Sequence, residues 1–391
     1  MPRFLHTADW QIGRQFGFDA EHGPILAEAR ITAVERLAAL ASEQRVDAVL
    51  VAGDVFDAQT ISDRTLRRLF NALAGFAGPW LMIPGNHDAA LAESVWTRAR
   101  RLGAVPPNVQ PLLAPEPALL QEQGFAVLPA PLVQRHTYGD LTAWFDETDT
   151  PAGLLRIGLA HGSVQGVLPG DIDSPNPIAA DRAARARLDY LALGDWHGCL
   201  CIDARTWYAG TPEPDRFKAN DAGQALLVEI DAPGALPRVT PLAVAQYRWR
   251  AWQAELRVTS DADELVGRLE QLEARDVVDL QIAGQLDLAA MQGLQQAIGR
   301  AEARARHLQA DLSRLQLAPT DDDIAGLQAD GYLGEVIDEL RVAQASADAQ
   351  QARGAQDALA LLAAALAQRR PVWAEGEAQA GQAQPAQAPQ P

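Results

Sequence analysis

The chain has 391 residues, 48% of them apolar, and a formal net charge of −18. This length and apolar content predict one large globular domain and a smaller one. The acidic balance argues against simple electrostatic wrapping of nucleic acid, although carboxylates grouped around metal ions would be neutralised by those ions.

The lack of a recognisable membrane-spanning or secretory segment and the cysteine usage both favour a cytoplasmic protein. The chain contains no uncharged apolar run of the roughly 18 residues that span a membrane. Its first residues do not follow the plan of a secretory signal peptide. Cys199 and Cys201 are one residue apart, a spacing that rarely forms a structural disulfide.

The first 230 residues alternate predicted strands with predicted helices. Residues 25–44 carry apolar side chains at helical spacing, and a second helix is expected over 62–76. Strands are expected over 3–6, 47–54, 80–88, 108–113, 125–132, 154–162, 190–198, 206–212 and 224–230, several of them running into loops. This order predicts a layered α/β sandwich.

The character of the chain changes near residue 245. A strand (250–258), a helix (261–272), a strand (277–284) and a helix from 287 to about 308 predict a small second domain. Alanine-rich helix follows over about 320–369, and the Gln- and Pro-rich end predicts a disordered tail. The expected parts are therefore 1–245, 246–318, 319–370 and 371–391.

Five short motifs place metal-binding residue types directly after predicted strands. The ends of neighbouring strands are where loops converge to build sites in α/β sheets. Carboxylate, amide and imidazole donors suit two divalent cations that share one carboxylate and clamp a phosphoryl group. The motif residues are Asp9 and Gln11; Asp54 and Asp57 in "AGDVFD"; Asn86, His87 and Asp88 in "PGNHD"; His161 in "AHGS"; and Asp195 and His197 in "GDWHG".

Each motif alone is weak. Gly-Asp is a common turn, and a single residue such as His161 is more often a hydrogen-bonded histidine of the core than a ligand. The ordered set is what favours a site, because all five motifs follow predicted strands within the first 200 residues.

The order of these motifs is similar to that of the calcineurin-like metallophosphoesterase superfamily. The stretches "FLHTADWQIG", "VDAVLVAGDVFD" and "WYAGTPEPDRF" resemble its DNA-repair exonuclease branch, whose bacterial members are SbcD-type nuclease subunits. The resemblance covers roughly residues 1–240. It implies an α/β/β/α sandwich, a smaller α+β capping domain and C-terminal helices.

The resemblance also implies roles for the motif residues. Asp54 would bridge two ions, and His87 would not be a ligand but would assist the leaving group. Asp57 lies where some relatives place a substrate-handling histidine, and we expect it to support the ligands. One ion would take Asp9, Gln11, Asp54 and His197, and the other Asp54, Asn86, His161 and Asp195.

Two expected histidine ligands are replaced in this chain, by Gln11 and Asp195. Both replacements keep an oxygen donor, while the site loses two imidazoles and gains one negative charge. We expect this to favour Mn²⁺, or Mg²⁺, over zinc. The alternative is a decayed site in an inactive relative.

The function that these motifs favour is a two-metal-ion DNA phosphodiesterase, an exonuclease subunit in DNA repair. The alternatives are a phosphoesterase acting on a cyclic nucleotide or phosphomonoester, and an inactive scaffold subunit. The chain has no P-loop, so an SMC-like coiled-coil ATPase implied by the resemblance would be a separate partner. The C-terminal helices either dock this partner or only pack on the capping domain. A second copy of this chain, in a homodimer, is a further candidate partner.

The remaining polar and aromatic residues have simpler expected roles. His22 and His136 are expected in loops and His307 on a surface helix, all solvated. Trp10 and Trp196 are expected to pack the floor of the site. Two arginine groups either contact DNA phosphates or form solvated helix faces; they are Arg64, Arg67 and Arg68, and Arg98, Arg100 and Arg101.

Overall fold

The computed structural model describes residues 2–18, 22–167, 176–326 and 331–368. One compact unit comprises Met1–Trp252, Leu272–Leu280 and Ala301–Ala310, and the other comprises Gln253–Gln271, Gln281–Arg300 and Asp311–Pro391. The tail expected over 371–391 lies outside the described residues. None of the helices described is long and apolar enough to cross a membrane.

The first sheet of the larger unit contains the strands that precede three of the motifs. Its strand order is β14-β13-β1-β2-β3-β4. Strands β1 to β4 are parallel, and β13 and β14 are antiparallel to their neighbours. The strands are β1 (Arg3–Thr7), β2 (Ala48–Ala52), β3 (Trp80–Ile83), β4 (Val109–Pro111), β13 (Gln224–Glu229) and β14 (Arg238–Ala243).

The second sheet contains the strands that precede the other two motifs. Its order is β11-β12-β10-β7-β6-β5, with parallel central strands and antiparallel edges. The strands are β5 (Ala118–Leu120), β6 (Phe125–Ala130), β7 (Leu155–His161), β10 (Tyr190–Gly194), β11 (Leu200–Cys201) and β12 (Thr206–Tyr208). A short pair, β8 (Ser163–Val164) and β9 (Pro177–Ile178), follows β7.

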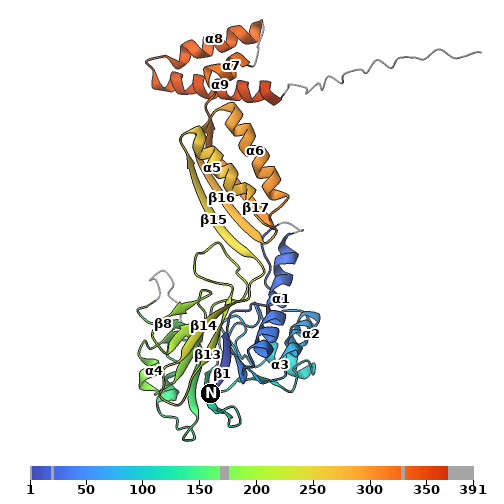
Figure 1. The fold of residues 1–391 in the computed structure, drawn as a ribbon, viewed down its shortest axis with the longest axis vertical. Helices are drawn as coiled ribbons and strands as arrows, with labels where there is room; N and C mark the ends of the chain where they lie inside the picture. The colour runs from blue at the N-terminus through green and yellow to red at the C-terminus, as the bar shows by residue number, and fades with distance from the viewer. Residues whose placement is uncertain (1, 19–21, 168–175, 327–330, 369–391) are drawn as a thin grey trace, which may run out of the picture. The chain divides into compact units, whose positions relative to one another are not determined.

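The two sheets enclose one apolar core between them and carry helices on their outer faces. Phe4 and Leu50 of the first sheet pack with Val127 and Tyr190 of the second, all with 0% exposure. Helices α1 (His22–Glu43), α2 (Asp63–Ala72) and α3 (Val95–Arg101) cover the first sheet (Figure 1). The second sheet carries the short α4 (Arg182–Arg185) and a 3₁₀ turn at Ala143–Asp146. The expected layered sandwich is confirmed.

The chain after residue 245 contains one strand that the sequence analysis missed. Strands β15 (Arg248–Leu256), β16 (Asp276–Leu286) and β17 (His307–Leu317) form one sheet in the order β15-β16-β17. Helices α5 (Thr259–Glu270) and α6 (Leu288–Glu302) connect them in sequence. The helix expected to reach residue 308 therefore ends earlier, because "HLQADL" alternates apolar and polar residues with the period of a strand.

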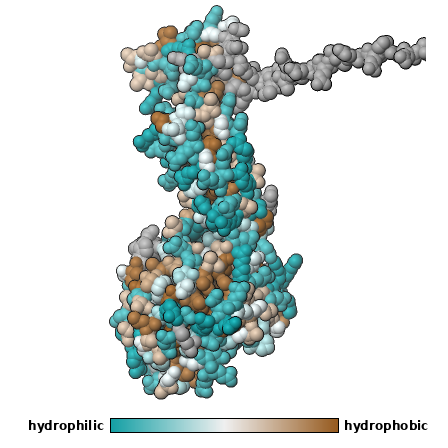
Figure 2. All heavy atoms as spheres, in the orientation of Figure 1, coloured by the Kyte–Doolittle hydropathy of each residue, from teal (hydrophilic) through white to brown (hydrophobic). Residues whose placement is uncertain are grey.

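The C-terminal segment of the second unit is helical, as expected from its alanine-rich sequence. It contains α7 (Asp321–Gly326), α8 (Tyr332–Gln344) and α9 (Ala349–Gln368). Ile324, Ile337 and Leu359 form a small buried cluster among these helices. Hydrophilic residues cover most of the face of this unit that Figure 2 shows.

Candidate metal centre

The five motifs converge at the carboxyl ends of strands from both sheets. Asp9 follows β1, Asp54 follows β2 and Asn86 follows β3, all in the first sheet. His161 ends β7 and Asp195 follows β10 in the second sheet. The sandwich therefore brings together residues that lie up to 186 positions apart in the sequence.

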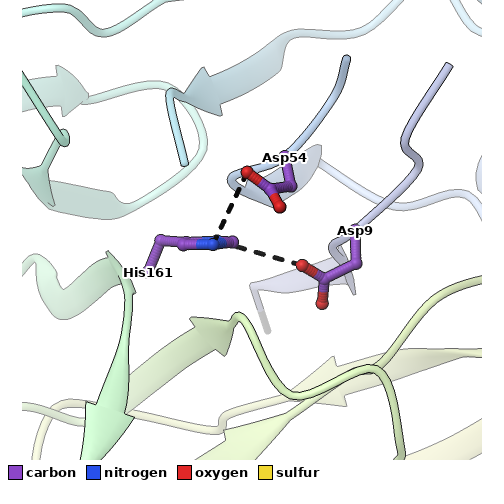
Figure 3. Close-up of side chains that lie close together, drawn as sticks. All are labelled: Asp9, Asp54 and His161. Atoms are coloured by element: carbon purple, nitrogen blue, oxygen red, sulfur yellow. Dashed lines mark ion pairs between the residues drawn. The ribbon is translucent and has the colours of Figure 1, made fainter. Parts of the chain in front are cut away.

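Asp9, Asp54 and His161 form a buried cluster at this edge (Figure 3). One donor atom from each lies within 4.8 Å of the others, and their exposures are 0%, 2% and 2%. The His161 Nε2 atom is 3.6 Å from Asp54 Oδ1, and its Nδ1 atom is 4.0 Å from Asp9 Oδ1. Nδ1 is also 2.8 Å from the Ala52 carbonyl oxygen, to which it donates, so Nε2 is the atom able to bind a cation.

The electrostatics of this cluster fit a divalent cation. Burial raises the pKa of Asp9 to about 6, against the attraction of His197 and His161. Burial also disfavours the protonated form of His161, but Asp54, Asp195 and Asp9 outweigh it and raise the pKa of this histidine to about 9. A histidine that favours a proton so strongly lies in an excess of negative charge. Hard oxygen and imidazole donors in such a field suit a divalent metal.

The backbone is strained at four of the candidate ligands. Asp9, Gln11, Asp54 and Asp195 have φ angles of 54°, 45°, 52° and 98°, in the left-handed region that residues other than glycine rarely adopt. Hydrogen bonds between the loops hold these conformations, including Gln11 N to Asp54 O at 2.9 Å. Such strain persists where the surrounding structure enforces it, which occurs often at functional sites.

Asn86 and Asp195 lie on the His161 side of the cluster. The Asn86 Oδ1 atom is 3.2 Å from His161 Nε2, and Asp195 Oδ1 is 3.7 Å from the same nitrogen. The backbone N–H of Asp195 donates to Asp9 Oδ1 at 3.1 Å. Oxygen atoms from both residues therefore lie next to the ring nitrogen that is able to bind a cation.

Gln11 and His197 lie on the opposite side of Asp54. The Gln11 Nε2 atom is 3.4 Å from Asp54 Oδ2 and 3.2 Å from His197 Nε2, while its Oε1 atom accepts a hydrogen bond from Arg14. The amide thus presents its nitrogen to the cluster, although the expected ligand atom was its oxygen. Asp215 supports His197 from behind, with Oδ2 2.9 Å from Nδ1.

Arg14, Asp215 and Arg216 are site residues that the sequence analysis did not identify. Burial disfavours the Asp215 carboxylate, yet its hydrogen bonds with His197 and Arg216 hold its pKa well below the usual range. The Arg216 guanidinium also lies 2.9 Å from His197 Nδ1. The one available signal was that "DRF" follows the "GTPEP" turn, and no local pattern links that stretch to His197.

His87 lies at the rim of the cluster. Its backbone N–H donates to Asp54 Oδ1 at 2.9 Å, and its Nδ1 atom donates to the Asp57 carbonyl oxygen at 2.8 Å. This second bond places a proton on Nδ1 and leaves Nε2 for a substrate. Asp57 thus contacts His87 through its backbone, while its side chain lies 3.8 Å from Arg14.

Asp88 shapes the loop that carries Asn86 and His87. Its carboxyl accepts the N–H groups of Gly85 at 2.6 Å and Phe56 at 3.1 Å. Burial and the neighbouring Asp54 raise the pKa of Asp88 to about 8. Asp88 therefore ties the loop after β3 to the loop after β2.

A cavity of about 400 Å³ opens beside the cluster. Its lining carries an excess of positive side chains, and the Lys218 ammonium lies 4.6 Å from the ring centre of Trp196. A larger cavity of about 580 Å³, near Arg156 and Arg205, contains none of the predicted site residues. The smaller cavity is lined by Gln11, Arg14, His87, Asp195, Trp196, His197, Arg216, Lys218 and Asn220.

Comparison with known families identifies the domain that carries this cluster. Residues 2–199, just over half of the chain, match the calcineurin-like phosphoesterase family. The chain belongs to the calcineurin-like phosphoesterase family. The resemblance inferred from the order of the motifs is confirmed.

Several relatives of this calcineurin-like phosphoesterase are named as subunits of the nuclease SbcCD. The Rhodobacter capsulatus protein is 44% identical over 96 residues, which is 22% of each chain. The Escherichia coli K12 protein is 27% identical over 269 residues, covering 58% of this chain and 64% of the relative. The Bacillus subtilis protein is 24% identical over 333 residues, covering 75% and 83%. The chain thus spans less than two thirds of the first two relatives.

Two histidines outside the family motifs were misplaced by the sequence analysis. His22 begins helix α1 and is not in a loop, and His307 begins strand β17 and is not on a helix. The His307 ring is 4.4 Å from the Phe18 ring and 5.0 Å from the His22 ring, so neither histidine is simply solvated. His136 is exposed in a loop, as expected.

Most of the candidate DNA-contacting arginines, which lie on the outer helices α2 and α3, bind other groups of the protein. Arg68 pairs with Glu28, and Arg101 lies 3.1 Å from Glu93. The side chains of Arg67, Arg98 and Arg100 donate to backbone carbonyl oxygens. These contacts favour the solvated helix face over phosphate binding.

Trp10 and the two cysteines follow expectation more closely, whereas Trp196 is half-buried and lines the cavity. Trp10 is 1% exposed and donates its indole N–H to Thr7 Oγ1 at 3.0 Å, so it packs the floor of the site. Cys199 and Cys201 are free cysteines.

Proposed function

We propose that this calcineurin-like phosphoesterase is a divalent-metal-dependent DNA phosphodiesterase, acting as an exonuclease subunit in DNA repair. The observation that carries the proposal is the buried cluster of Asp9, Asp54 and His161 beside an open cavity. The names of the similar nuclease subunits supply nucleic acid as the substrate class, and the resemblance of the motifs to the DNA-repair exonuclease branch narrows it to DNA.

The proposed centre holds two ions, Mn²⁺ or otherwise Mg²⁺. Such ions lower the pKa of a bound water and neutralise charge on the phosphate. One ion would take Asp9, Gln11, Asp54 and His197, and the other Asp54, Asn86, His161 and Asp195. The Asp195 carboxylate, and the Gln11 amide oxygen once it is turned from Arg14 toward the cluster, support the preference for hard cations over zinc.

His87 is the proposed group that assists the leaving oxygen. Its Nδ1 proton is held by the Asp57 carbonyl, so Nε2 is the position at which a proton is held for or taken from the substrate. Asp57 is proposed as the residue that orients this ring. Arg216 and Lys218 line the same cavity and place positive charge where a phosphodiester would lie.

The domain and partner assignments are also proposals. Residues 1–245 would form the nuclease domain, 246–318 the capping domain and 319–370 the helical segment. An SMC-like coiled-coil ATPase would dock on that segment, where Val342 and Leu361 are 76% and 72% exposed. A size measurement of the purified chain would show whether it also forms a homodimer.

Cleavage of end-labelled linear DNA in the presence of Mn²⁺ tests the proposed activity. We expect His87→Ala to lower the rate by roughly 10²- to 10⁴-fold, the usual contribution of a positioned acid or base. His136→Ala, at an exposed loop histidine, serves as the matched control. Cleavage of a chromogenic phosphodiester without cleavage of DNA would instead identify a small-substrate enzyme. No cleavage of either substrate, even after the SMC-like ATPase partner is added, would identify a scaffold subunit.

A further inference from the structure

The orientation of the Gln11 amide is determined by Arg14. A guanidinium carries only donors, so the amide atom that faces it must be the oxygen. The amide nitrogen is therefore turned toward Asp54 Oδ2, at 3.4 Å, and His197 Nε2, at 3.2 Å. Gln11 is 1% exposed, so water has little access to this arrangement.

This orientation opposes cation binding between Asp54 and His197. An amide NH₂ group offers hydrogens and cannot ligate a metal ion. It lies within hydrogen-bonding range of two atoms that would have to share a cation. A cation can use Gln11 at this position only after the amide has turned its oxygen inward.

Arg14 is itself held in place. Its guanidinium lies 3.2 Å from Asp215 Oδ2 and 3.8 Å from Asp57 Oδ1, and its side chain is 26% exposed. Asp215 also contacts His197, so one buried carboxylate links Arg14 to the histidine on the far side of the amide. Releasing Gln11 from Arg14 would therefore remove a charge-assisted hydrogen bond within a partly buried network.

The other side of Asp54 is arranged differently. Around His161 Nε2 lie Asn86 Oδ1 at 3.2 Å, Asp54 Oδ1 at 3.6 Å and Asp195 Oδ1 at 3.7 Å. All three are oxygen atoms, and none of them has to rotate away from a guanidinium to face a cation.

We propose that Arg14 is a positioning residue that holds Gln11 in a non-ligating orientation and so makes the two cation positions unequal. The position at His161 binds tightly. The position at His197 binds weakly and fills only when the Gln11 amide turns over. This inference rests on the proposed use of the site as a two-cation centre.

Titration of Mn²⁺ into the metal-stripped full-length chain tests the inference by calorimetry, with the paramagnetic resonance of free Mn²⁺ as a second readout. In the unsubstituted chain we expect two classes of site at least about tenfold apart in affinity, which is about 1.4 kcal/mol. Arg14→Met is expected to tighten the weaker class by about tenfold and to leave the tighter class unchanged.

Lys218→Met is the matched control. It removes one positive charge from the lining of the same cavity, where the Lys218 ammonium lies over the Trp196 ring while the Gln11 oxygen accepts from Arg14. It is expected to tighten the weaker class by much less than Arg14→Met. Equal effects of the two substitutions would show general charge repulsion and overturn the role of Arg14.

Gln11→Glu provides a second test that does not depend on the folding of the Arg14 variant. A carboxylate can accept from Arg14 with one oxygen and present the other to the cation, so it is expected to tighten the weaker class. An unchanged weaker class in this variant, or equal sites in the unsubstituted chain, would refute the proposal. DNA cleavage is scored separately, so unequal Mn²⁺ sites without cleavage would reject only the proposed nuclease function.

Discussion

Replacing Arg30 tests how the fold holds the loop after β1, which carries Asp9. This arginine of α1 is 1% exposed. Its guanidinium donates to the carbonyl oxygens of Trp10 at 2.7 Å, Glu213 at 3.0 Å and Asp9 at 3.2 Å, and to Thr211 Oγ1 at 2.9 Å. One buried side chain thus ties the loop after β1 to the turn after β12.

Replacing Arg30 with Met removes all four donors but keeps much of the side-chain volume. Hydrogen bonds from a charged donor contribute about 1.5–3 kcal/mol each, and a buried acceptor without a partner costs about 1–3 kcal/mol. The contributions are not additive, and removing a buried charge offsets part of the loss. We therefore expect a net destabilisation of about 3 kcal/mol. That corresponds to a fall in melting temperature of about 6–12 °C for a domain of this size.

Thermal unfolding followed by circular dichroism measures this effect. Arg36→Met is the control, because Arg36 lies exposed on the same helix and donates to a single carbonyl, that of Val244, at 2.9 Å. Arg30→Met is also expected to weaken Mn²⁺ binding, since it releases the backbone of Asp9. If Arg30→Met lowers the melting temperature no more than Arg36→Met does, the role assigned to the Arg30 hydrogen bonds is wrong.

Three further predictions concern the site and its surroundings. Gly85→Ala would place a Cβ atom 2.2 Å from Asp54 Oδ1, so it should displace that carboxylate and weaken Mn²⁺ binding in a titration. Gly299→Ala, with open space around its Cβ position, should instead raise the melting temperature slightly. Burial raises the pKa of Glu213 to about 7 from its ordinary 4.5. The contribution of this group to stability is therefore present below pH 4.5 and is lost as the pH rises through 7. The melting temperature of Glu213→Gln should therefore change less between pH 5 and 7.5 than that of the unsubstituted chain. Chelation should abolish DNA cleavage and Mn²⁺ should restore it better than zinc, whereas full recovery with zinc and none with Mn²⁺ would contradict the hard-cation assignment.

The residue types of the candidate site could be predicted from local sequence because each follows an apolar strand. Strand ends in an α/β sheet meet along one edge, so Asp9, Asp54 and His161 were expected to lie together, and the structure places them within 4.8 Å. Strand β17 was missed because its sequence alternates only over its first half. The edge strand β14 was missed because Pro241 interrupts its pattern.

By itself, the sequence determined the layered α/β fold, the family and the positions of the metal-binding motifs, since these depend on short-range patterns of apolar and polar residues. Only the tertiary structure decided what each side chain does at the site. Gln11 and His197 are 186 residues apart in the sequence. The hydrogen bond from Arg14 determines which amide atom faces the cluster, and this matters only because folding brings Asp54 and His197 next to the amide nitrogen. Side-chain orientation depends on partners from distant segments, and no local pattern encodes those partners.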